Sequence, residues 1–310
     1  MAIIDPLSTS GVDVTAELVD SRRAPRNSSR AALIWARLRS TPRFWVGALV
    51  VGGMIVWAVA GLWITKWSPT DQDLINSSVG PTASHWFGTD DIGQDIYAET
   101  VSGLRRSLVI GLIAGPAGTL IAALVGAFAG YRGGRADAVI SWLINLLLVL
   151  PAFFILVLLS PVFKSLSFLV LTAFIALFSW MVMAQVIRAQ TKSLRDREFV
   201  KAARFMGVGT GTIIRRHILP NVASLLIIDA TLGVVAAINS ETALSYFGFG
   251  IQRPQVSLGV LLADGTPSAT TRPWMFVFPA LVLVVLLFAV SLVGDALRDA
   301  VDPTSGSTRD

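Results

Sequence analysis

Two carboxylic acids lie within the apolar run of residues 222–246. Helices that span a membrane rarely carry ionisable side chains at such positions. The two acids are Asp229 and Glu241, and Asn239 lies close to the second acid. An ionisable side chain at membrane depth costs roughly 2.5 to 3.5 kcal/mol, so each one needs a function or a partner. Their separation of twelve residues turns a helix about a third of a turn beyond whole turns, so both could border one aqueous path. A structural alternative stays open, in which Asp229 bonds a neighbouring helix or lies near the headgroups and Glu241 lies at the water interface.

Acidic residues also gather in the long segment from Thr65 to Arg106, at Asp90, Asp91 and Asp95. Closely spaced carboxylates can bind calcium, but these miss the EF-hand spacing and lack its glycine turn. Aspartate is also common at the first residue of a helix, where its oxygens accept backbone N–H groups. Apolar residues follow at helical spacing, so we expect a capped, short amphipathic helix that leads into the next apolar run.

A basic segment, residues 188–221, separates two long apolar runs. The chain contains no Gly-x-x-x-x-Gly-Lys-Ser/Thr motif, so it does not bind ATP in the P-loop manner. It has no cysteine, and His85 and His217 lie far apart, which argues against a metal site. No Ser/His/Asp arrangement or carboxylate pair suggests a soluble active site. We therefore expect no enzymatic activity and no cofactor in this chain.

The composition is that of an integral membrane protein. Hydrophobic residues make up 54% of 310 positions, charged residues make up 15%, and the mean hydropathy is +0.67. The surplus of 25 Lys and Arg over 20 acids could suggest nucleic acid, but it is typical of loops retained on the cytoplasmic side of a membrane. We therefore expect the lipid bilayer, and no nucleic acid, as a partner.

Six apolar runs are long enough to cross a bilayer, which takes about 20 helical residues. They lie near 44–64, 107–130, 139–159, 167–187, 222–246 and 274–293. Placing residues 1–43, 131–138, 188–221 and 294–310 in the cytoplasm puts 19 of the 25 Lys and Arg there. The sequence therefore predicts an all-α membrane protein with six spans and both termini in the cytoplasm. The predicted parts are a tail (1–43), a six-span domain (44–293) with outer loops 65–106 and 247–273, and a second tail (294–310).

Shorter features refine this layout. Residues 31–39 are amphipathic and predict an interfacial helix, which Pro42 separates from the first span. Small residues recur along 107–130, which favours close packing of that helix in the interior or against another subunit. Pro151 predicts a kink, and the apolar patch 258–262 predicts a short helix folded back toward the bundle.

Lys201-Ala202-Ala203 is followed after three residues by Gly207, and after nine more by His217-Ile218-Leu219-Pro220. With this spacing the chain resembles the permease subunits of bacterial ABC importers. Lys201 stands where that family has glutamate, and His217 where it has isoleucine. Residues 85–95, 241–250 and 294–303 resemble the dipeptide, oligopeptide and nickel branch, above all the C subunits of oligopeptide permeases. The resemblance covers about residues 33–303.

The resemblance implies a type I ABC importer permease in a bacterial inner membrane. Its implied partners are a second homologous permease, one or two P-loop ATPases that bind ATP and Mg²⁺, and an extracytoplasmic substrate-binding protein. A coupling loop, 198–212, would bind the ATPase. The residues implied for docking or coupling are Glu198, Phe199, Lys201, Ala202, Ala203, Arg204, Met206, Gly207, Leu219 and Pro220. Asp90, Asp91, Asp95 and Arg253 are expected to face the binding protein.

Other classes of protein stay open at this stage. A secondary transporter would need no ATPase, but such proteins often show repeated halves with broken helices, and the spans here show no repeat. A membrane enzyme would need a catalytic arrangement that the sequence lacks. The same importer architecture could carry nickel, haem or a glycan instead of a peptide.

Overall fold

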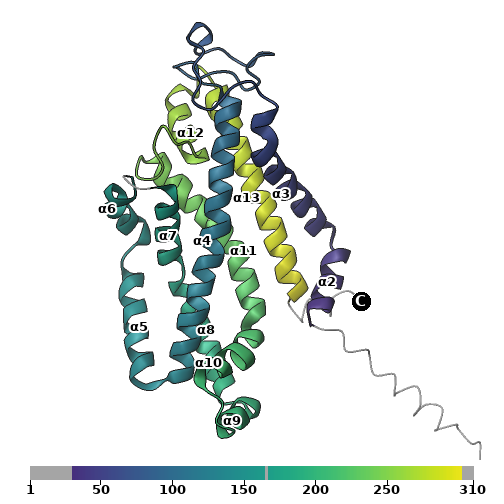
Figure 1. Ribbon diagram of the computed structural model, residues 1–310, viewed down its shortest axis with the longest axis vertical. Helices are drawn as coiled ribbons and strands as arrows, with labels where there is room; N and C mark the ends of the chain where they lie inside the picture. Colours follow the sequence, from purple (N-terminus) through teal and green to yellow (C-terminus); the bar gives the residue numbers. More distant parts are fainter. Residues whose placement is uncertain (1–29, 165–166, 302–310) are drawn as a thin grey trace, which may run out of the picture.

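The computed structural model describes residues 30–164 and 167–301, which form a long bundle of helices (Figure 1). The predicted tails 1–29 and 302–310 lie outside the described residues. The longer helices are α2 (Arg30–Ser40), α3 (Pro42–Ala60), α4 (Ile96–Arg132), α5 (Gly134–Val149), α6 (Ala152–Lys164), α7 (Phe168–Ser179), α8 (Met181–Arg195), α9 (Glu198–Phe205), α10 (Thr210–Ile213), α11 (Leu219–Tyr246), α12 (Leu258–Gly265) and α13 (Trp274–Val301). We call the end of the bundle that carries residues 64–95 the loop end, and the opposite end the α9 end (Figure 1).

Helix α4 is the centre of the bundle, and the small residues along it explain why. A Cβ on Gly115 would lie 2.5 Å from the backbone nitrogen of Val234 in α11. A Cβ on Gly130 would lie 2.5 Å from the carbonyl oxygen of Arg188 in α8. Only glycine allows backbones to approach this closely, so the predicted interior packing of this helix is confirmed.

Four described helical segments are long and apolar enough to span a membrane: 42–63, 96–132, 210–246 and 274–301. Two bent pairs, α5 with α6 and α7 with α8, raise the number to six if each pair is one span. The first pair bends by 79°, more than the kink expected at Pro151. The cause is local, because the residue before a proline is disfavoured in helical geometry and Leu150 is extended.

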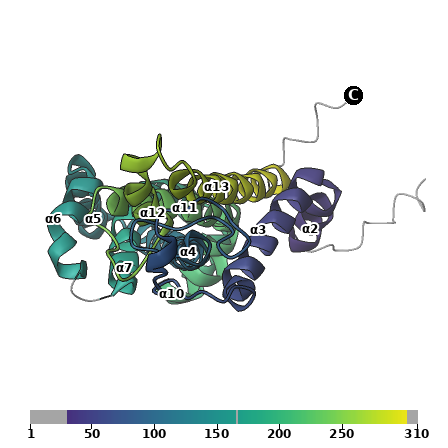
Figure 2. The ribbon, with the colours of Figure 1, turned by 90° about the horizontal axis from the view of Figure 1, so that it is seen from above.

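Helices α2, α3 and α13 flank the core on one side, and α5 and α6 lie on the other. Seen from above, the helices are therefore arranged in an elongated row (Figure 2). A helix, α2, lies at the position where the sequence predicts an interfacial helix, and a break at Thr41 separates it from α3, which begins at Pro42. Leu38 of α2 packs against Ala296 and Ala300 of α13. Residues 294–301, expected in the second tail, continue α13 instead.

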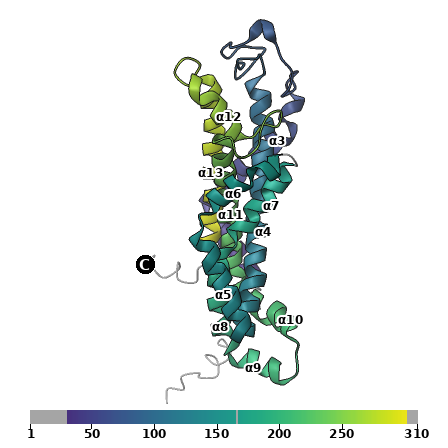
Figure 3. The ribbon, with the colours of Figure 1, turned by 90° about the vertical axis from the view of Figure 1, so that its left-hand side faces the viewer.

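The loop end differs from the sequence prediction at one point. The short helix expected before the second span is not separate, because its residues form the first turns of the 37-residue helix α4. Asp95 caps this helix by accepting the backbone N–H of Ala98 at 2.8 Å. Helix α12 is the expected short helix, capped by Ser257 and packed at the end opposite α9 (Figure 3).

Candidate functional site

Helix α9 lies at the end of the bundle, and its own sequence fixes both of its ends. Arg197 has an extended backbone, so the helix begins at Glu198. The negative charge of Glu198 lies in the first turn, where it is stabilised by the positive end of the helix dipole. Gly207 ends the helix with φ +77°, a conformation that suits glycine. The backbone N–H of Gly207 donates to Arg204 at 3.0 Å and that of Val208 donates to Ala203 at 3.1 Å, which is the Schellman pattern.

The inner face of α9 packs into this chain. Val200 and Ala203 are 1% and 2% exposed and join a cluster with Ile213 and Ile218 from the following segment and Ala127 from α4. Ala203 was expected to contact a partner, but its side chain lies inside the chain instead. The spacing explains this, since residues three apart on a helix share one face.

The outer face of α9 is open to solvent. Phe205 is 90% exposed and Met206 is 75% exposed, far more than apolar side chains usually are. The other exposed residues are Glu198, Phe199, Lys201, Ala202 and Arg204. The charged groups of the Lys201 and Arg204 side chains have no ion pair or hydrogen bond to another described residue. Phe205 was missed by the sequence analysis, although it directly precedes Met206 in the printed sequence.

The segment after α9 is mostly helical. The turn is confined to residues 207–209, because α10 begins at Thr210 and runs through a π-helical stretch, Ile214–Ile218, into α11. Pro220 lies in the first turn of α11 and Leu219 is half-buried in the cluster around Ala203. A proline fits there because the first N–H groups of a helix need no helical partner.

An ion cluster around the buried Asp137 positions α8, which leads into α9. Asp137 of α5 accepts hydrogen bonds from Arg188 and lies 2.6 Å from the ammonium of Lys192. Gln185 of α8 also donates to Asn145 of α5 at 2.8 Å, which is a further bond between the two helices. The cluster ties the basic segment to α5, and the sequence analysis did not identify Asp137.

The three residues of the fifth apolar run that were expected to border a path have separate environments. Asp229 is half-buried and accepts a hydrogen bond from Thr119 of α4 at 2.6 Å, which supports its structural alternative. Glu241 is fully buried and accepts bonds from Ser107 at 3.2 Å and Ser245 at 2.7 Å. Its side chain reaches no solvent in this chain, which argues against both the aqueous path and the water interface expected for it. Asn239 is exposed.

Arg253 organises the loop end. Its guanidinium donates to Glu99 at 2.7 Å and to Gln94, and it lies 3.0 Å from Asp264 and 3.6 Å from Asp90. Glu99 is 0% exposed, so this arginine neutralises a carboxylate that water cannot reach. Arg253 therefore joins the loop before α4 to the segment around α12.

The acids expected to face a binding protein are mostly turned inward. Asp95 is 1% exposed and lies 2.8 Å from the buried His85. Asp90 is also buried, and it accepts the backbone N–H groups of Ile92 and Gln94. Burial raises the pKa of Asp90 despite these bonds. Asp91 is exposed and pairs with Arg272.

Two families match the sequence. Residues 122–305 match the binding-protein-dependent transport system inner membrane component. Residues 29–81 match the N-terminal transmembrane domain of oligopeptide transport permease C. The first match covers more than half of the chain and includes α9, the turn at Gly207 and the first turn of α11.

Relatives of known description match along most of their lengths. The oligopeptide transport system permease protein OppC of Mycobacterium bovis is 50% identical over 230 residues, which are 74% of this chain and 79% of the relative. OppC of Bacillus subtilis is 33% identical over 284 residues, 90% of this chain and 93% of the relative. A chain of the inward-facing MetNI methionine ABC transporter is 19% identical with a TM-score of 0.48, covering 66% of this chain and 96% of that one. The chain therefore belongs to the inner-membrane permease family of binding-protein-dependent transport systems, among the OppC-type permeases.

Proposed function

We propose that this chain is one of two permease subunits of an ATP-driven peptide importer, and that the outer face of α9 binds an ATPase subunit. The observation that carries the proposal is that face: exposed apolar residues beside unpaired cations, Lys201 and Arg204. Such a surface is typical of a protein interface, with an apolar centre and a charged rim. ATP and Mg²⁺ would be bound by the partner, because this chain has no P-loop.

Six spans with both termini in the cytoplasm are the topology that supports this function. Each bent pair then counts as one span, and the basic segment 188–221 lies on the same side as α2. Figure 1 draws α2, the end of α13 and α9 toward the same end of the bundle. The excess of lysine and arginine in these segments is typical of the cytoplasmic side.

Because its inner face is buried against this chain, α9 would transmit movement of the ATPase to the helices it packs on. Val200 and Ala203 pack on Ile213 and Ile218, and that segment continues without a break into α11. A rigid helix pressed by a moving partner transmits displacement to what it packs against, so ATPase closure would move α11. The turn at Gly207 sets the angle between α9 and α10.

A substrate-binding protein would dock at the loop end. Asp90 and Asp95 are buried and support that surface from within. Leu74 and Ile75, on a short turn of the loop, are 71% and 93% exposed and offer an apolar contact. Asp91, which is exposed, would contribute charge at the same surface.

The peptide substrate rests on the relatives, whose descriptions concern oligopeptides and, in one Bacillus subtilis protein, dipeptides. Nickel, haem or a glycan are the alternatives. Growth on peptides as the sole nitrogen source, with and without this chain, separates them, because a metal or glycan importer would not change that growth.

Asp229 and the exposed Asn239 are the residues of α11 that we propose lie by the path. Asp229→Leu is then expected to reduce uptake without loss of assembly, and unchanged uptake would leave Asp229 structural.

Co-purification of the ATPase with the tagged permease complex tests the docking proposal. Ala202→Glu and Lys201→Glu place negative charge on the open face of α9 without touching its buried side. We expect both to reduce recovery of the ATPase while the permease itself is recovered normally. Recovery equal to that of the wild type with both variants would refute docking at α9.

A further inference from the structure

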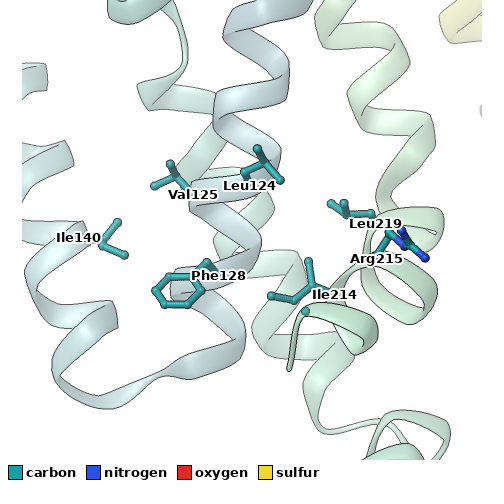
Figure 4. Close-up of a pocket in the computed structure, with 8 residues that line it drawn as sticks. Leu124, Val125, Phe128, Ile140, Ile214, Arg215 and Leu219 are labelled. Carbon is teal, nitrogen blue, oxygen red and sulfur yellow. The ribbon is translucent and has the colours of Figure 1, made fainter. Parts of the chain in front are cut away.

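Two adjoining cavities lie on the side of α4 near the α9 end. The first, about 630 Å³, is lined by Leu124, Val125, Phe128, Ile140, Gly211, Ile214, Arg215 and Leu219. Figure 4 shows these side chains, which come from α4, α5 and the segment that leads into α11. Seven of the eight residues carry no charge, and Leu124 and Phe128 are 52% and 43% exposed. An apolar hollow at membrane depth suits a hydrocarbon chain.

The second cavity, about 510 Å³, is polar and basic. Its lining residues are Tyr131, Arg132, Arg195, Asp196, Arg204, Val208, Gly209 and Thr210. Arg195 lies 3.8 Å from Asp196, its one acidic neighbour there. The guanidinium groups of Arg132 and Arg204 have no ion pair or hydrogen bond to another described residue, so the cavity keeps an excess of positive charge.

The two cavities are joined by the elements that line them. Phe128 and Arg132 are one helical turn apart on α4, and Thr210 and Gly211 are neighbours on α10. The basic cavity lies at the terminal turn of α4, and the apolar cavity lies one turn further into the predicted span. Arg215 lies at the edge of the apolar cavity beside Leu219 (Figure 4).

We infer that this composite surface binds a phospholipid with an anionic headgroup. The headgroup phosphate lies in the basic cavity among the arginines, which suit phosphate oxygens because their planar guanidinium donates in pairs. One acyl chain lies along α4 in the apolar cavity. Basic residues at the cytoplasmic side of a span recognise anionic lipids in this way. A soluble anion would use the basic cavity but would leave the apolar one unfilled.

Bound there, the lipid touches both the core helix α4 and the residues that follow α9. The headgroup contacts Arg132 at the end of α4 and Thr210, which directly follows the turn at residues 207–209. It braces the turn by joining it to the end of α4. This goes beyond the proposed function, because neither ATPase docking nor peptide passage requires a lipid at this place.

Photocrosslinking tests the inference on the full chain in its purified complex, reconstituted in phosphatidylcholine vesicles. The probe is phosphatidylglycerol with a photoactivatable acyl chain. We expect crosslinks within residues 124–140 and 211–219, competed by unlabelled phosphatidylglycerol but not by phosphatidylcholine or inorganic phosphate. Arg132→Gln and Arg215→Gln should each lower crosslinking roughly fivefold, the effect of one basic residue at an anionic lipid.

Arg43→Gln is the matched control, because Arg43 is also exposed and basic but lies on α3. Its crosslinking at the site should equal that of the wild type. Equal competition by phosphatidylcholine, or no change with Arg132→Gln and Arg215→Gln, would overturn the inference. Loss of the crosslink on addition of the ATPase would also overturn it and would assign these cavities to the protein partner.

Discussion

The loop end and the α9 end both carry many polar residues, but they use them in opposite ways. At the loop end Arg253 meets Gln94, Glu99 and Asp264, and most of its acids are bonded within the chain. At the α9 end the charged groups of Lys201 and Arg204 form no ion pair or hydrogen bond with a described residue, and Phe205 is 90% exposed. The loop end therefore pairs most of its charged groups within the chain, and what it leaves open to a partner is mainly the apolar side chains of Leu74 and Ile75. A region that leaves charged and aromatic groups unpaired is one that a partner completes.

The largest effect is expected at the loop end, from Arg253→Leu. This change leaves Glu99 buried without its cation, and breaking a buried pair costs roughly 3 to 5 kcal/mol. We expect about 3 kcal/mol, the lower end, because Arg253 is 35% exposed. Thermal unfolding of the detergent-purified complex measures the loss. Arg272→Leu breaks an exposed pair with Asp91 and should cost about 1 kcal/mol or less. Equal losses from the two variants would show that the loop end is not self-contained.

At the α9 end, Phe205→Ala should weaken a partner rather than the fold. An exposed aromatic side chain at the centre of an interface contributes about 2 kcal/mol or more, so ATPase binding should fall at least roughly 30-fold. Thermal stability of the permease should not change, because Phe205 has little burial to lose. Ile75→Ala, equally exposed at the loop end, is the control for ATPase binding. Binding that survives Phe205→Ala unchanged would contradict the contrast between the ends.

Gly207→Ala should strain the turn after α9. Gly207 has φ +77°, and a side chain in this left-handed region costs roughly 1 to 2 kcal/mol. Gly209→Ala is the matched control, because Gly209 has φ −64° and its added Cβ would meet nothing within 4 Å. Hydrogen exchange of residues 203–208 should rise in the first variant only. The same protection in both would mean that this turn does not depend on glycine.

The smallest effect concerns pH and Asp90. Because burial raises its pKa, the folded protein takes up this proton at higher pH than the unfolded chain does. The wild type should therefore gain stability relative to Asp90→Asn as pH falls through the folded-state pKa, and lose that gain as pH rises again. Unfolding midpoints of the two proteins, compared from neutral pH to about pH 4, measure the difference. Parallel curves would show that burial of Asp90 has no energetic consequence.

The sequence predicted some features of the two ends of the bundle but not others. The apolar runs were sufficient for the long helices, because membrane spans leave local patterns. The loop that contains α9 was located through the resemblance carried by Ala202, Gly207 and Pro220, but the face of α9 that is exposed was not predicted. The pairs of Arg253 with Glu99 and of Asp137 with Arg188 were not predictable, since each joins segments far apart in the sequence. Glu241 was misassigned for the same reason. A buried carboxylate bonded by Ser107 from another helix cannot be distinguished by spacing from one in water.

Cysteine accessibility tests most directly the claim that a partner completes the α9 end. The chain has no cysteine, so Phe205→Cys, Met206→Cys and Ile75→Cys each place a single thiol on the surface. Each variant is labelled with a maleimide in the purified permease complex, with and without the ATPase subunits. We predict that the ATPase protects positions 205 and 206 and leaves position 75 fully labelled. Equal labelling of positions 205 and 206 with and without the ATPase would contradict the account.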